Sequence, residues 1–142
     1  MMNAALNTHA AQALSQHLFA MPNSIPNIAR SLSTVGATAF AIEAAALGLF
    51  GTVALVAGAA NPASSRNDKA GQALFMGLGI LNVGGAALAG AASWLGYRWV
   101  CQSALSADPG VQHLWSFVLL PYAVTSLLAA KRFRDMGQPF IA

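Results

Sequence analysis

Three long apolar stretches, separated by short polar segments, dominate the pattern of the chain. They cover about residues 35–59, 73–97 and 112–130. Crossing the hydrocarbon core of a bilayer as an α-helix takes about 20 residues, and the third stretch is near the lower limit of that length. An α-helix is favoured in lipid because it satisfies its own peptide groups. The pattern predicts an all-α membrane protein with three transmembrane helices.

A shorter unit precedes the first apolar stretch. The apolar positions of residues 3–20 fall roughly on one face, which predicts a short amphipathic helix at the membrane surface. Pro22 and Pro26 follow it and predict a hinge, because each proline disfavours helix at the residue before it. The predicted organisation is an amphipathic helix and hinge over residues 1–27, then a three-helix transmembrane domain over residues 28–142.

The composition agrees with a protein that has lipid as its main solvent. Of its 142 residues 56% are hydrophobic and 8% are charged, whereas a soluble domain averages about 25% charged residues. The formal net charge is +3, and no basic run is interleaved with aromatic residues. The charges therefore argue against nucleic acid as a partner and favour the lipid bilayer.

The basic residues predict an orientation. Three spans place the loop over residues 60–71 and the segment after the third span on one side of the membrane, and that side carries five of the seven Lys and Arg residues. Those five are Arg66, Lys69, Lys131, Arg132 and Arg134, and the other two are Arg30 and Arg98. The side richer in positive charge faces the cytoplasm. We therefore expect a cytoplasmic C-terminus, and the alanine-rich, lysine-poor composition favours the bacterial inner membrane.

Glu43 is the only ionisable residue within the first span, and an ionisable residue in a spanning segment marks a candidate functional site. Counted from the outer end of each span, Glu43 lies at the depth of Gly90 and Ser93 in the second span and of Pro121 and Tyr122 in the third. Three interpretations stay open. Glu43 takes part in a transport or proton-handling site with the Tyr122 hydroxyl or the carbonyl freed by Pro121, stabilises packing as a neutral buried carboxyl, or contacts a basic residue of a partner protein.

Small residues recur every four positions in the second span and form two stripes. The stripes are Asn82, Ala86 and Gly90, and Gly85, Ala89 and Ser93. Small side chains let the backbones of membrane helices approach closely, and an amide is able to bond across helices. The stripes are therefore predicted to be helix-packing seams.

No combination of residues indicates catalysis or a bound cofactor. His9, His17 and His113 are not joined by a cysteine or carboxylate at ligand spacing, so no metal site is predicted. Gly77 and Gly79 have no strand before them and no Lys-Ser or Lys-Thr after them, so a phosphate loop is not predicted either. No serine or cysteine nucleophile has a nearby base. We expect neither an enzyme nor a cofactor.

The C-terminal segment carries a family-like motif. The motif consists of Leu120-Pro121 in the third span, then Lys131-Arg132, Arg134-Asp135, Gly137 and Pro139-Phe140. It resembles the end of a spanning helix in the DUF805 (YhaH-like) family of small bacterial inner-membrane proteins, in which a basic pair, a polar pair and a glycine precede a small residue and an aromatic. The resemblance implies a membrane location. Independently of it, Lys131, Arg132 and Arg134 are predicted to lie among lipid headgroups and to help set the orientation.

Together these patterns predict a small integral membrane protein with a structural function. We expect an accessory subunit that packs with itself or with another membrane protein through small-residue helix faces. The alternative is a small transporter or channel component that uses Glu43. A Glu43 carboxyl buried against Tyr122 and Ser93 in a dry three-helix core favours the first function. A water-filled cavity that reaches this carboxyl, or a ring of Glu43 residues in an oligomer, favours the second.

Overall fold

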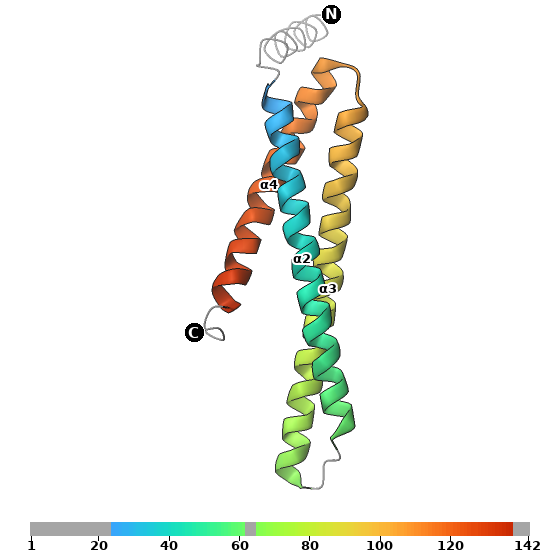
Figure 1. The fold of residues 1–142 in the computed structure, drawn as a ribbon, viewed down its shortest axis with the longest axis vertical. Helices are drawn as coiled ribbons and strands as arrows, with labels where there is room; N and C mark the ends of the chain where they lie inside the picture. Colours follow the sequence, from blue (N-terminus) through green and yellow to red (C-terminus); the bar gives the residue numbers. More distant parts are fainter. Residues whose placement is uncertain (1–23, 62–64, 138–142) are drawn as a thin grey trace, which may run out of the picture.

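The computed structural model describes residues 24–61 and 65–137, which Figure 1 shows as a coloured ribbon. These ranges form three α-helices and no strand: α2 (Ser24–Ala60), α3 (Arg66–Leu105) and α4 (Pro109–Gly137). All three helices are long and apolar enough to cross a membrane. The predicted all-α class with three candidate spans is therefore confirmed, whereas the amphipathic helix predicted over residues 3–20 lies outside the described residues.

Capping residues explain where α3 and α4 begin. Ser65 and Asp68 form a capping box, in which Asp68 N donates to Ser65 Oγ (3.1 Å) and Ser65 N donates to Asp68 Oδ2 (3.0 Å). Pro109 is the first residue of α4, where its missing N–H leaves no partner unsatisfied. Gly110 N donates to Asp108 Oδ1 (2.8 Å). A connection of only three residues, 106–108, thus joins α3 to α4.

The predicted hinge is wrong at Pro26, because α2 begins at Ser24 and includes this proline. Pro22 lies outside the described residues. Proline is tolerated in the first turn of a helix, since the backbone N–H groups there have no partner within the helix. All three helices are also longer than the predicted spans, and α4 has 29 residues. α2 has 37 residues and α3 has 40, which correspond to about 55 and 60 Å at about 1.5 Å per residue.

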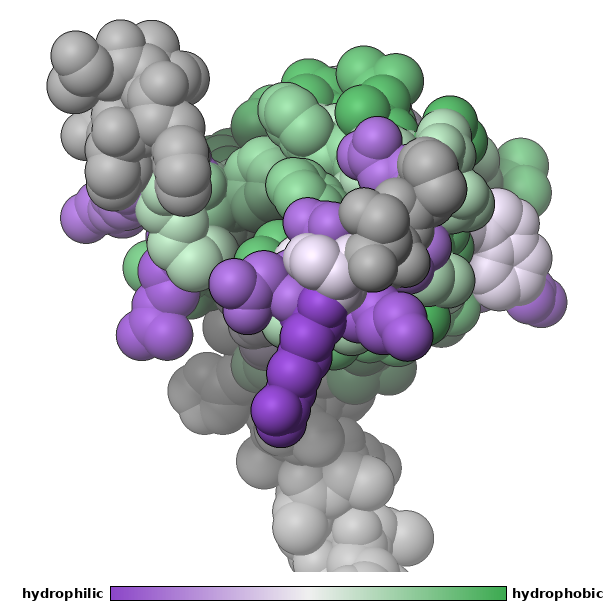
Figure 2. All heavy atoms as spheres, turned by 90° about the horizontal axis from the view of Figure 1, so that it is seen from below, coloured by the Kyte–Doolittle hydropathy of each residue, from purple (hydrophilic) through white to green (hydrophobic). Residues whose placement is uncertain are grey.

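The helices α2 and α3 form a long antiparallel hairpin, and α4 lies against one half of it, running in the same direction as α2 (Figure 1). α2 packs on both other helices, while α3 and α4 meet at few positions. Polar residues gather at the hairpin tip that holds the α2–α3 connection, and apolar residues cover the sides (Figure 2). This distribution suits a rod that lies across a membrane with its sides in lipid.

The third apolar stretch is displaced along the rod relative to the first two. Ser33 Oγ donates to Leu119 O (2.8 Å), and a Cβ built on Gly36 would lie 3.8 Å from Ala123 Cα. Residues at the same level of α2 and α4 therefore differ by 86 or 87 in number (33 to 119, 36 to 123). The centre of the third predicted span thus lies about 12 residues, or ~18 Å, from the centre of the first.

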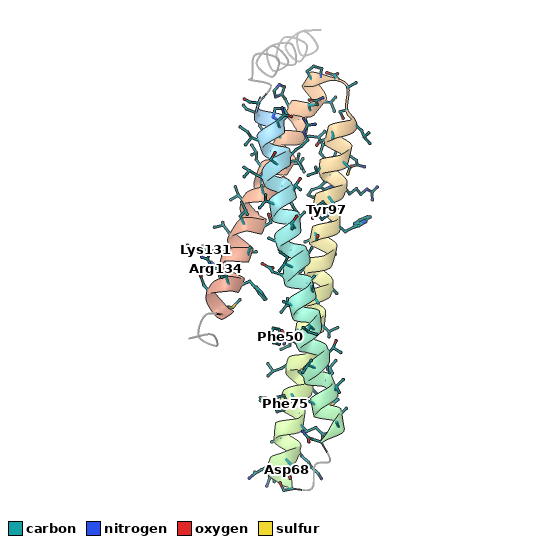
Figure 3. The ribbon with its side chains drawn as sticks, in the orientation of Figure 1. Phe50, Asp68, Phe75, Tyr97, Lys131 and Arg134 are labelled. Atoms are coloured by element: carbon teal, nitrogen blue, oxygen red, sulfur yellow. The ribbon has the colours of Figure 1, made fainter. Side chains whose placement is uncertain are left out.

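This displacement corrects the depths predicted for Glu43 and Tyr122, which are not level with one another. The physical reason is the length of α3, which continues to Leu105, eight residues beyond the predicted end of its span at residue 97. The short connection then starts α4 at that level. As a consequence Lys131 and Arg134 lie far above Asp68 along the rod (Figure 3), by roughly 30 Å at about 1.5 Å per residue.

Candidate functional site

Tyr122 is the point at which the three helices meet. Its hydroxyl donates to Ala92 O of α3 (2.8 Å). Its ring centroid lies 6.2 Å from that of Phe40 on α2 and 5.8 Å from that of Trp99 on α3, the second pair being edge-on. The ring rests on Gly96, where any Cβ would collide with it. Glycine at this position is therefore what allows α4 to approach α3.

Buried serine hydroxyls connect the helices at the same end of the rod. Ser33 on α2 is fully buried and donates to Leu119 O of α4 (2.8 Å). Ser93 on α3 is buried and donates to Ala37 O of α2 (2.8 Å). Because a helix carbonyl keeps a free lone pair, these bonds leave the backbone ladder intact. The hydroxyls are therefore fully occupied in holding helices together.

Glu43 is buried but is not joined to the other two members of the predicted polar site. Only 8% of its surface is exposed, and Oε1 is buried with no hydrogen-bond partner among the described residues. Tyr122 and Ser93 donate to backbone carbonyls instead. A carboxyl in such surroundings is costly to ionise, since a buried charge needs a partner. Glu43 is thus buried, but it is not bonded to Tyr122 or Ser93 as expected of the dry core, and its Oε1 keeps an unused acceptor among the described residues.

The predicted small-residue seams lie inside the chain, against α2. A Cβ on Gly85 would lie 3.2 Å from Leu47 Cδ1, and one on Gly90 would lie 3.9 Å from Ala44 Cβ. Ala86 Cβ lies 3.7 Å from the position of a Cβ on Gly48, and Ala89 is 8% exposed. Asn82 differs, because its amide donates to Leu78 O of its own helix (2.8 Å). Gly85, Ala86 and Gly90 therefore face α2 within the hairpin, and Ala89 is buried.

The sequence did not predict the close approach of Gly51 on α2 to Gly79 on α3. A Cβ on Gly51 would lie 3.0 Å from Gly79 O, and a Cβ on Gly79 would lie 3.0 Å from Gly51 O. Gly58 is similarly close to Met76, with 2.9 Å between a built Cβ and Met76 Cγ. Gly51 and Gly58 are seven residues apart, a spacing that places both on one face of a helix and that the sequence does display.

His113 was evaluated in the sequence only as a metal ligand, whereas the structure shows it as a core residue of α4. It is 2% exposed, and its Nδ1 has no hydrogen-bond partner among the described residues. His113 belongs to the buried face of α4, which continues at Ser116, Leu119 and Ala123. This three-to-four-residue recurrence is the signal that would have marked His113 as a core residue. No group of three or more His, Cys, Asp or Glu residues is close enough to hold a metal in the described ranges.

The charged residues that were predicted to mark the headgroups lie on the surface. Lys131 and Arg132 are exposed, and Arg134 lies 3.7 Å from its neighbour Asp135, with both side chains exposed. On α3 the Arg98 guanidinium lies 5.2 Å from the Trp94 ring centroid. Exposed ion pairs contribute little to stability. These groups are therefore better suited to contact lipid or water than to hold the fold.

Fold and site together define an all-α protein with three helices long and apolar enough to span a membrane, tied to one another by hydroxyl–carbonyl bonds and close glycine contacts. No family model, curated protein or solved structure matches the chain. The resemblance of its C-terminal segment to the DUF805 family therefore stays a prediction.

Proposed function

We propose that this chain is a small integral membrane protein that acts as a structural or accessory subunit. The observation that supports this proposal most directly is the use of its interhelical hydroxyls. Ser33, Ser93 and Tyr122 all donate to backbone carbonyls of a neighbouring helix at 2.8 Å, so the polar groups of the core stabilise the rod. Purification in a mild detergent, followed by identification and quantification of the proteins that accompany the chain, tests the proposal. A fixed stoichiometry with itself or with a partner supports it, and a purely monomeric chain contradicts it.

Transport is the second candidate function, and the unpartnered Glu43 Oε1 is the observation that favours it. In this case the carboxyl takes up a proton or a cation during transport. Proton and cation flux into proteoliposomes, measured for the wild type and for Glu43→Gln, distinguishes the two functions. A flux that the substitution abolishes supports a transporter, while the absence of flux in both proteins supports the structural function.

The proposed location is the bacterial inner membrane, with the C-terminus in the cytoplasm. The bias of five positive charges against two in the sequence supports this orientation. Lys131 and Arg134 lie at a different level of the rod from Asp68 in the first turn of α3, so the two basic groups do not meet the same headgroup layer (Figure 3). Replacing Lys131, Arg132 and Arg134 together with Gln leaves two charges against two, and we expect a C-terminal reporter to become divided between the two sides of the membrane. The same reporter on the unmodified chain is the control. A reporter that stays wholly cytoplasmic contradicts the charge argument.

A further inference from the structure

The rod has two ends that differ in the number of helices. Residues at the same level of α2 and α4 differ by about 87 in number, so Gly137, the last residue of α4, is level with about residue 50 of α2. Beyond that level α2 continues to Ala60. We call residues 50–60 and 66–83 the two-helix end, and residues 24–49, 84–105 and 109–137 the three-helix end. Figure 3 shows Phe50 and Phe75 below Lys131 and Arg134. In the described ranges no third helix covers the two-helix end.

The faces that α4 covers at the three-helix end continue into the two-helix end. On α2 the seven-residue series through Gly36, which packs against Ser126 of α4, continues through Glu43 to Phe50. On α3 the same series through Gly96, which packs against Tyr122 of α4, continues to Asn82 and Phe75. Phe50 is 67% exposed and Phe75 is 48% exposed. The face composed of Phe50, Phe75, Leu78 and Asn82 is called the Asn82 face below.

Asn82 gives this face a specific chemistry. It is the only amide between residues 73 and 97, in a segment without any charge up to Arg98. Its Nδ2 donates to Leu78 O of the same helix (2.8 Å), and its Oδ1 accepts no hydrogen bond among the described residues. Asparagine amides of membrane helices commonly bond across helices, so an amide acceptor on an otherwise apolar helix face marks a candidate contact. A partner helix that carries a hydrogen-bond donor at the level of Asn82 would satisfy the Oδ1 of this residue.

We propose that a second copy of this chain docks on the Asn82 face, with the two Asn82 amides hydrogen-bonded across a two-fold axis. An amide is both donor and acceptor, so it is complementary to itself when the same surface meets in both copies. The apolar Phe50, Phe75 and Leu78 pack around this central bond. The second copy lies against the part of α2 and α3 that α4 does not reach. This inference rests on the proposed structural function and names the chain itself as the partner.

Cysteine cross-linking in native membranes tests the inference on the full chain. In a Cys101→Ser background, Phe75→Cys places a thiol on the Asn82 face. Gly77→Cys places one two residues away on the opposite side of the same helix, where nothing lies within 4 Å of a built Cβ. With a short bismaleimide we expect covalent dimers from Phe75→Cys at least fivefold more often than from Gly77→Cys. Equal yields at the two positions, or no dimer at either, overturn the inference.

The role of the amide is tested by adding a second substitution to Phe75→Cys. Asn82→Leu removes the hydrogen bond and should lower the dimer yield several-fold, whereas Asn82→Gln keeps an amide and should restore part of it. A dimer yield that Asn82→Leu leaves unchanged contradicts the proposed bond, provided that both variants show the wild-type thermal transition in detergent. A constant stoichiometry with a different protein, without cross-linked dimers, rejects the second copy while the structural function stands.

Discussion

The three-helix end and the two-helix end hold their helices together by different means. At the three-helix end, hydroxyl groups bond to carbonyls of neighbouring helices, as Ser33 does to Leu119 O and Tyr122 to Ala92 O. At the two-helix end the main contact is steric, with Gly51 and Gly79 each meeting the other's backbone. Interhelical hydrogen bonds in membranes contribute about 0.6 kcal/mol on average, while overpacking a tight contact costs about 1–3 kcal/mol. We therefore expect the contact between Gly51 and Gly79, which involves backbone on both sides, to contribute more to stability than a single hydroxyl–carbonyl bond.

The largest expected effect is at the glycine contact of the two-helix end. Gly51→Ala introduces a Cβ that would lie 2.8 Å from Val83 Cγ2, 2.9 Å from Val83 N and 3.0 Å from Gly79 O. Because two of these atoms belong to the backbone, the helices must separate, and we expect a loss of about 2 kcal/mol in the free energy of unfolding. Reversible unfolding in mixed detergent measures it.

Gly84→Ala is the matched control for this substitution. Gly84 lies on α3 with nothing within 4 Å of a built Cβ. Alanine is also the better helix former, by about 0.8–1.0 kcal/mol in a soluble helix. We therefore expect no loss of stability in Gly84→Ala. Similar losses for both variants would mean that the helix backbone, and not the contact between α2 and α3, determines the effect.

A smaller effect is expected at the three-helix end from Tyr122→Phe. The substitution keeps the ring between Phe40 and Trp99 but removes the donor to Ala92 O. We expect a loss of about 0.6 kcal/mol, and at most about 1.7, as for other hydrogen bonds between membrane helices. The same unfolding assay measures it. A loss larger than that of Gly51→Ala would mean that this hydrogen bond contributes more to stability than the contact between Gly51 and Gly79.

Tyr97→Phe serves as the control for Tyr122→Phe. The Tyr97 hydroxyl lies 2.7 Å from Thr38 Oγ1, and Thr38 Oγ1 also donates to Thr34 O (2.8 Å), at an exposed position. Its removal leaves Thr38 with its bond to the backbone of α2. We therefore expect a smaller loss of stability than for Tyr122→Phe. This difference isolates the contribution of the buried bond to Ala92 O from that of a tyrosine hydroxyl in general.

The number and type of helices followed from the sequence, but their relative levels did not. Three apolar stretches of sufficient length predict three helices because lipid leaves few alternatives for the backbone. The level of α4 depends on how far α3 continues beyond its apolar part, and Arg98 with the polar residues after it gave no sign that the helix runs on to Leu105. The three-residue connection then transmits this extension to the position of α4.

For the contacts between α2 and α3, the sequence predicted the residues on α3 but not their partners on α2. The small residues of α3 identified a packing face, but their partners on α2 include Leu47 and Ala44, which look like any apolar residues of a span. The Ser33 hydroxyl was missed for a different reason. A serine is polar by composition, yet inside a membrane helix it is able to bond a carbonyl of the next helix and become a core residue, as Ser33 does.

The smallest expected effect is that of Glu43→Gln, on the face of α2 that continues to Phe50. Oε1 has no partner among the described residues, so an amide in its place breaks no hydrogen bond that this oxygen makes. If the carboxyl is neutral in the membrane, Gln has nearly the same shape and charge. We then expect the free energy of unfolding to change by less than about 0.5 kcal/mol, as for substitutions that disturb no specific interaction.

Glu43→Ala provides the contrast in the same unfolding assay. It removes most of a side chain that is 8% exposed and leaves a space between the helices, so we expect a clear loss, no larger than that of Gly51→Ala. A small loss for Gln with a larger loss for Ala indicates that Glu43 fills space at the three-helix end. A large loss for Gln instead means that the negative charge itself is stabilised, which requires a cationic partner and contradicts the neutral packing role.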